Sequence, residues 1–207
     1  MTVGQLHRYG FKVVVMGDSQ VGKTTLIKKF TRGTFDKDYV KTIGAQFSKF
    51  DSEIEGNITK LEIWLIGPHE EFHDLYPGFF RETRAAIIIF SLEDNDLGRD
   101  SFNHISFWHG QVQKHCGDVP IYLFGNKVDL IDEDEFDESQ IEKIVKEFNL
   151  KGYYLTSTVT GLNIVKAFND ITIELYNHYK TIPPAKPKIS PVSNEKKKKK
   201  KHHKKGA

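Results

Sequence analysis

Apolar and polar residues follow two different spacings that alternate along the chain to about residue 180. Short, mostly apolar runs are typical of strands buried in a sheet, and they lie near residues 11–16, 46–55, 58–65, 85–91, 119–124 and 152–155. Helical spacing of apolar residues occurs near 23–32, 101–115, 138–149 and 162–178, with a short or irregular helix after Phe72. The dipeptide Gly56-Asn57 predicts a β-hairpin between the second and third runs. The alternation predicts an α/β domain with a mixed, mostly parallel six-stranded sheet flanked by helices.

The first strand pattern leads into a glycine-rich segment, G-x-x-x-x-G-K-T at 17–24, which opens an apolar-periodic helix. A strand, this loop and a helix together are the context of a phosphate-binding loop. Gly17 and Gly22 let the backbone approach phosphates, which the loop N–H groups and the helix N-terminus then face. Lys23 would supply positive charge to the outer phosphates, and the Thr24 hydroxyl would bind Mg²⁺. A plain turn between a core strand and a core helix is the alternative. The predicted nucleotide contacts are Gly17, Asp18, Ser19, Gln20, Val21, Gly22, Lys23, Thr24 and Thr25.

A second polar motif, N-K-V-D, follows the buried-strand pattern at 119–124. Ligand sites in open α/β sheets lie at the carboxyl ends of strands. Asp129 can accept both N–H groups of the Watson–Crick edge of guanine, whereas adenine offers a different donor pattern. Asn126 can hydrogen-bond the far side of the base, and the stem of Lys127 can cover its face. Four polar residues after a strand often form a solvated turn, so the guanine prediction depends on this motif and the phosphate loop occurring together.

On these two motifs the chain resembles the Ras-superfamily small GTPases, and among them the Rab-like branch, over about residues 9–180. The resemblance implies a P-loop GTPase domain that binds GTP or GDP together with Mg²⁺. It further implies guanine contacts from Ser157 and Thr158, and an aromatic contact to the base from Phe35. Thr42 matches the first-switch threonine that closes on Mg²⁺ and the terminal phosphate.

Three aromatic residues, Phe47, Trp64 and Phe79, match the positions where Rab-like proteins contact effectors. The resemblance implies that protein effectors bind through the switch regions and this triad. Ordinary core or half-buried packing is the alternative for each residue. Trp64 favours the effector interpretation more than the phenylalanines do, because Trp usually keeps its N–H near a partner or water.

The second switch departs from the family pattern. Where family members carry D-T-A-G-Q-E, this chain has L-I-G-P-H-E. Leu65 replaces the aspartate that holds Mg²⁺ through water, and Pro68 replaces a glycine whose N–H touches the terminal phosphate, although proline has no N–H. His69 replaces the glutamine that orients the attacking water, which makes it the candidate catalytic residue. A one-residue shift places Gly67 at the glycine position but Trp64 at the aspartate position, so neither alignment restores the carboxylate.

These departures predict a GTP-binding protein with weak or absent GTP hydrolysis, acting as a monomeric interaction module in signalling or membrane trafficking. A lost charge-assisted hydrogen bond costs about 1.5–3 kcal/mol, so GTP should lose affinity relative to GDP and Mg²⁺ should be held less firmly. Two alternatives remain open. One is an active GTPase that works through His69 or a residue from a partner. The other is a scaffold that no longer exchanges nucleotide.

Composition agrees with one soluble domain. A chain of 207 residues can bury a sizeable core, and no apolar run approaches the ~20 residues of a membrane helix. The N-terminus has no signal-peptide pattern, and Thr2 stands where myristoylation requires glycine. The single cysteine, Cys116, excludes an intramolecular disulfide. We expect a cytoplasmic protein that is not secreted.

The C-terminal region has a different composition. We divide the chain into a GTPase domain at 1–180, a proline-rich linker at 181–195 and a disordered polylysine tail at 196–207. Residues 194–207 hold eight lysines and one glutamate, a charge of +7, so residues 1–193 carry −5 of the net +2. A near-neutral total therefore combines an acidic body with a strongly basic tail.

The basic stretch Lys196–Lys205 predicts salt-sensitive contact with an anionic membrane surface or with nucleic acid. A solvated tail without a dedicated partner is the alternative. Rab-like proteins usually end in prenylated cysteines, and this sequence has none near its end. We therefore expect no C-terminal prenylation, and membrane contact that is peripheral and reversible.

Overall fold

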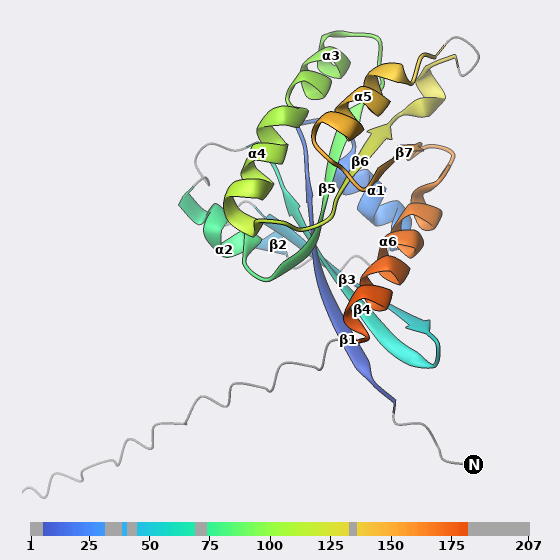
Figure 1. The fold of residues 1–207 in the computed structure, drawn as a ribbon. Coiled ribbons are helices and arrows are strands. Elements are labelled where there is room, and N and C mark those ends of the chain that lie inside the picture. Colours follow the sequence, from blue (N-terminus) through green and yellow to red (C-terminus); the bar gives the residue numbers. More distant parts are fainter. Residues whose placement is uncertain (1–5, 32–38, 41–44, 69–73, 133–135, 182–207) are drawn as a thin grey trace, which may run out of the picture.

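A computed structural model describes residues 6–31, 39–40, 45–68, 74–132 and 136–181. Figure 1 shows a twisted central sheet with helices on both of its faces. The predicted tail and all of the predicted linker except Thr181 lie outside the described residues, and so do the three site candidates Phe35, Thr42 and His69. In the described part of the chain, no helix is both long and apolar enough to cross a membrane.

The described strands form one mixed sheet. In sheet order they are β2 (Tyr39–Val40), β3 (Ala45–Ile54), β4 (Asn57–Ile66), β1 (Arg8–Met16), β5 (Thr83–Ser91), β6 (Ile121–Asn126) and β7 (Gly152–Thr156). The pairs β2–β3 and β3–β4 are antiparallel, and β4–β1, β1–β5, β5–β6 and β6–β7 are parallel. This confirms the predicted α/β fold class: the six predicted strands are present, and the two-residue β2 extends the edge beside β3.

The predicted hairpin between β3 and β4 is present, but its turn lies one residue earlier than the predicted Gly56-Asn57, because Asn57 already pairs with Ile54. Its turn residues Glu55 and Gly56 have φ values of 50° and 74°. Two successive positive φ angles are typical of a type I′ turn, whose twist matches that of the strands it joins. Beyond the turn, the pairing continues without a break from Ile54 opposite Asn57 to Ala45 opposite Ile66.

Helices lie between the strands and after the last one. They are α1 (Lys23–Phe30), α2 (Tyr76–Phe80), α3 (Asp96–Asn103), α4 (Ile105–Cys116), α5 (Ser139–Glu147) and α6 (Ile164–Tyr179), and a 3-10 turn covers Val128–Leu130. The single helix predicted at 101–115 is instead two helices that meet at His104. The first begins earlier than predicted because the Asn95 side chain accepts the N–H of Gly98 and caps the N-terminus of α3.

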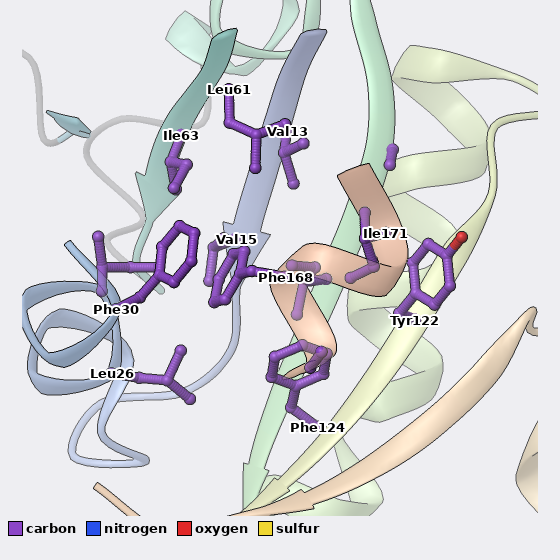
Figure 2. Close-up of a cluster of buried hydrophobic side chains, with 14 of the residues drawn as sticks. Val13, Val15, Leu26, Phe30, Leu61, Ile63, Tyr122, Phe124, Phe168 and Ile171 are labelled. Atoms are coloured by element: carbon purple, nitrogen blue, oxygen red, sulfur yellow. The ribbon is translucent and has the colours of Figure 1, made fainter. Parts of the chain in front are cut away.

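The core has two layers, one on each face of the sheet. Helices α1 and α6 cover one face, and α2, α3, α4 and α5 cover the other (Figure 1). Figure 2 shows the first layer, in which Phe30 of α1 and Phe168 of α6 meet over β1. Their rings are stacked with centroids 4.1 Å apart. Strand β5 is buried on both faces of the sheet, which explains its almost uninterrupted apolar sequence.

Candidate nucleotide-binding site

The loop between β1 and α1 has a backbone that only glycine tolerates at two positions. Gly17 and Gly22 have φ values of 147° and 96°. A Cβ on Gly17 would lie 2.1 Å from the carbonyl oxygen of Ile89, and one on Gly22 would lie 2.3 Å from Nδ2 of Asn126. Side chains are therefore excluded by the neighbouring β5 and β6 strands. The loop surrounds the N-terminus of α1, whose free N–H groups favour anions.

Lys23 is the cationic group of this loop. Its Nζ donates a hydrogen bond to the carbonyl oxygen of Gly17 at 2.8 Å and another to the carbonyl oxygen of Asp18. Burial lowers the pKa of Lys23 to about 8. An anion bound beside this amine would favour its charged form and raise its pKa again, so the buried lysine favours an anion in the loop.

Asn126, the first residue of the N-K-V-D motif, is fully buried and joins three segments. Its Nδ2 donates to the carbonyl oxygen of Val21 at 2.8 Å, and its Oδ1 accepts from the Thr156 hydroxyl at 3.2 Å. The side chain thus connects the phosphate loop with the ends of β6 and β7. This structural role was not predicted from the sequence. One amide N–H remains for the predicted contact with a base.

The other two motif residues differ in their surroundings. Asp129 is exposed in the 3-10 turn after β6, where its carboxylate is open to a ligand. Lys127 has a positive φ of 71°, and its Nζ forms an ion pair with Glu93. Glu93 also accepts the Ser91 hydroxyl at 2.9 Å, and the amine of Lys127 lowers the pKa of the Glu93 carboxyl. The sequence analysis missed Glu93, and its place directly beyond the end of β5 was the available signal.

The segment after β7 lies beside the phosphate loop. The methyl group of Thr158 would be 3.9 Å from a Cβ on Gly22. Ser157 is fully buried, and its hydroxyl accepts the N–H groups of Val159 and Thr160 at 3.2 and 3.0 Å. The Ser157 side chain therefore shapes the loop, which leaves its backbone as the group available for a base.

A contact between the phosphate loop and α4 was also missed. Asp18 accepts Nε1–H of Trp108 at 2.9 Å, and its second oxygen lies 2.6 Å from Nδ1 of His104. The Trp108 ring is buried in the second core layer. The carbonyl oxygen of Asp18 is one of the two acceptors of Lys23. The side chain that anchors this loop to α4 therefore belongs to the same residue that orients the lysine.

The region expected to hold Mg²⁺ contains the Thr24 hydroxyl and the amide of Gln46, whose oxygens are 3.4 Å apart. Leu65, at the position of the family aspartate, is 4% exposed and packs in the first core layer. Among the described residues, no group of three or more His, Cys, Asp or Glu side chains is placed to hold a metal ion. The hydroxyl and amide oxygens fit a cation that is held largely by nucleotide phosphates.

The three aromatic residues predicted to contact effectors lie together across β3, β4 and α2. The rings of Phe47 and Trp64 are edge-to-face with centroids 5.3 Å apart, and Phe79 lies 6.3 Å from Trp64. Phe79 is buried, whereas Phe47 and Trp64 are half-buried. The Nε1 atom of Trp64 is buried without a hydrogen-bond partner among the described residues.

Comparison with known proteins agrees with this geometry. The Ras family model matches residues 12–177. The chain belongs to the Ras family. It is 32% identical to Ras-related protein Rab-26 of Bos taurus, over 87% of this chain and 69% of the relative. It is 34% identical to Ras-related protein Rab-32B of Dictyostelium discoideum, over 88% of this chain and 71% of the relative. Identity to Ras-related protein Rab-1D of the same organism is 27%, over 88% of this chain and 87% of the relative.

The expected resemblance is therefore confirmed: this is a Rab-like small GTPase of the Ras superfamily, with the α/β fold of that group. Members of the family bind GTP and GDP, so the chain is a Rab-like GTP-binding protein. The Ras-family match spans the phosphate loop, the N-K-V-D motif and the altered second switch. Weak hydrolysis, Mg²⁺ binding and the roles of single residues stay predictions.

Proposed function

We propose that this Rab-like protein binds GDP and GTP in the β1–α1 loop and acts as an interaction module that hydrolyses GTP weakly or not at all. One observation supports the loss of hydrolysis above the others. Leu65 stands at the position of the family aspartate, and its side chain packs into the core with only 4% exposure. An apolar side chain held there supplies no charge to Mg²⁺ or its waters.

Nucleotide binding is proposed to use the polar groups at the carboxyl edge of the sheet. Lys23 neutralises the outer phosphates, while the loop N–H groups and the N-terminus of α1 bind them. Asp129 is exposed and selects guanine by accepting its paired N–H groups, and Lys127 covers the base with its aliphatic stem. Thr24 is the proposed ligand for Mg²⁺, and a bound Mg²⁺ would offset phosphate charge.

The second switch is proposed to be the defective part. Pro68 has no N–H to offer the terminal phosphate. The preceding carbonyl oxygen, that of Gly67, accepts the Tyr76 hydroxyl at 3.1 Å, which holds this backbone against α2. Removing one donor that stabilises a transition state costs about 10²–10³ in rate. We therefore expect bound GTP to stay unhydrolysed much longer than in family members with the complete motif.

Downstream function is proposed to lie in protein contacts made by Phe47, Trp64 and Phe79. The half-buried rings of Phe47 and Trp64 pack edge-to-face, with the buried Phe79 beside Trp64, so the exposed parts of the first two rings are the proposed contact area for an effector. The relatives named Rab-26, Rab-32B and Rab-1D support a role in membrane trafficking or signalling. We further propose that Lys196–Lys205 binds an anionic surface, which predicts salt-sensitive vesicle co-sedimentation that deletion of 194–207 abolishes.

The proposed nucleotide binding is tested by extracting nucleotide from the purified protein and by competing a fluorescent GDP with GTP, GDP and ATP. The proposal predicts extracted GDP or GTP and competition by guanine nucleotides alone. Equal competition by ATP would overturn the assignment of Asp129. Absence of any guanine nucleotide binding would instead favour the scaffold alternative.

A further inference from the structure

Gln46 lies in a row of three residues that crosses the sheet towards the phosphate loop. It is opposite Leu65 in the β3–β4 pairing, and Leu65 is opposite Val15 in the β4–β1 pairing. Residues directly opposite each other in neighbouring strands project from the same face of a sheet. Leu65 and Val15 belong to the core layer that α1 covers. The side chain of Gln46 is therefore directed to the face that carries α1.

The Gln46 side chain meets the phosphate loop at one atom. The Thr24 hydroxyl donates a hydrogen bond to Oε1 of Gln46 at 3.4 Å, across 22 residues of sequence. Both residues are half-buried, so the contact is partly shielded from water. Leu65, the next residue along the row, has no acceptor for that proton. The acceptor is thus supplied by the strand beside the one that carries the carboxylate in other family members.

A threonine hydroxyl that binds a cation does so through an oxygen lone pair, so its proton must be directed elsewhere. An acceptor for that proton fixes the rotation of the hydroxyl and makes its oxygen a better ligand. We propose that Gln46 is a positioning residue that holds the Thr24 hydroxyl in the orientation needed for Mg²⁺ and thereby replaces the missing carboxylate at residue 65. This inference rests on the proposed binding of guanine nucleotide with Mg²⁺.

The replacement is chemically incomplete. An amide oxygen accepts the same proton as a carboxylate but carries no negative charge, so it orients Thr24 without attracting the cation electrostatically. The protein should therefore require more Mg²⁺ for nucleotide retention than a member with the aspartate. Changes in groups that orient a metal ligand typically cost 10–100-fold in metal affinity, which sets the size of the expected effects.

The test measures release of fluorescent GDP across a Mg²⁺ titration, with GDP affinity in EDTA as the metal-free reference. Gln46→Leu should raise the Mg²⁺ concentration for half-maximal retention by about 10-fold or more. Gln46→Glu, which adds charge at the same acceptor, should lower that concentration below the value of the parent. The affinity for GDP in EDTA should be unchanged in both. Glu53→Gln, an exposed amide–carboxylate exchange on the same strand, is the matched control.

A double-mutant cycle separates positioning from a general structural role. In a Thr24→Ala background, Gln46→Leu should not raise the Mg²⁺ concentration for half-maximal retention any further, because Gln46 acts through the hydroxyl that is missing there. The inference would be overturned if the two substitutions raised this Mg²⁺ concentration additively, or if Gln46→Leu alone left it unchanged. If Gln46→Leu fails to fold, the test uses Gln46→Glu alone. A Gln46→Glu variant that needs as much Mg²⁺ for half-maximal retention as the parent contradicts the proposal. A parent protein that binds no GDP would refute the proposed function instead.

Discussion

Two segments at the carboxyl edge of the sheet differ in what they bring to the candidate site. The β1–α1 loop presents Lys23, two glycines with positive φ and a helix N-terminus. Lys23 donates to the carbonyl oxygen of Gly17 within the loop, and Asn126 of β6 donates to that of Val21. The segment that ends β4 presents Leu65, which is buried, and Pro68, which lacks an N–H. The two strands are adjacent and parallel, so position in the fold does not cause the difference.

The comparison shows that binding and hydrolysis place separate demands on one fold. Binding needs groups that neutralise phosphates and recognise a base, and these groups are stabilised by contacts within the protein. Hydrolysis needs groups aimed at the terminal phosphate and at water, and these come from the second switch. A chain can therefore keep the first set while replacing the second. Changes to the phosphate loop or the N-K-V-D motif should therefore act mainly on nucleotide affinity, and changes to the second switch mainly on hydrolysis and Mg²⁺-dependent retention.

The largest expected effect is the loss of GDP affinity caused by Asp129→Asn in the N-K-V-D motif. Losing the charged acceptor for two N–H groups, at about 1.5–3 kcal/mol for each bond, should weaken GDP by at least roughly 100-fold. Xanthine nucleotides, which supply the reversed pattern, should gain affinity. Competition against a fluorescent GDP measures both. The exposed Asp118→Asn, at the opposite end of β6 from the motif, is a matched control, and equal guanine affinity in parent and Asp129→Asn would contradict the assignment.

The next effect concerns the second switch. Restoring three family residues with Leu65→Asp, Pro68→Gly and His69→Gln should raise single-turnover hydrolysis of GTP by about 10-fold or more, since each lost donor is worth 10²–10³. The buried site of Leu65 makes the aspartate costly, so thermal unfolding must be measured alongside the rate. GDP affinity should stay within a few-fold of the parent. A folded triple variant with an unchanged rate would show that the second switch does not limit hydrolysis.

A smaller effect is the pH dependence of nucleotide affinity. The pKa of Lys23 is about 8 in the free protein, and bound phosphates should raise it, so binding takes up a proton above that pH. Affinity for GDP should be constant below pH 8 and fall by up to about tenfold per unit above it. Titration of fluorescent GDP between about pH 7 and 9 measures this. Lys23→Arg stays charged throughout, so a decrease of equal size in that variant would assign it to another group.

The smallest effect tests the contact between the phosphate loop and α4. Trp108→Phe removes the donor that holds Asp18 at 2.9 Å, which should cost about 1–3 kcal/mol of stability. Because Asp18 also orients Lys23 through its carbonyl oxygen, affinity for GDP should fall a few-fold. Thermal unfolding and GDP titration measure the two changes. Gln113→Ala on the exposed face of α4 should change neither. If Trp108→Phe loses stability without losing affinity, this contact serves folding alone.

The sequence predicted features that depend on local pattern. The strands and the two nucleotide motifs occur where their residue types and spacings indicated, and the β3–β4 hairpin turns one residue earlier than predicted. The break at His104 was missed because apolar spacing continues across it, while the cap that starts α3 is a single side-chain hydrogen bond from Asn95. The spacing of apolar residues predicts a helix here, but it does not reveal where a single capping side chain starts that helix.

Features that depend on distant pairing were not predictable. Gln46 reaches Thr24 only because β3, β4 and β1 lie in a particular register. Asp18 and Trp108 are 90 residues apart and meet because α4 packs over the carboxyl end of β1. In a single sequence, Gln46 is an ordinary polar residue of an alternating strand. Its place in the site follows from the register of the sheet, which local composition does not specify.

The central claim is that this Rab-like protein retains guanine nucleotide binding while lacking effective hydrolysis. Loading the purified protein with radiolabelled GTP, and then following bound nucleotide and released phosphate in one turnover with Mg²⁺ present, measures both halves in one sample. The account predicts that GTP is bound and remains largely intact over the period in which a family member with the D-T-A-G-Q motif converts it to GDP. Conversion to GDP at the rate of that family member would contradict it.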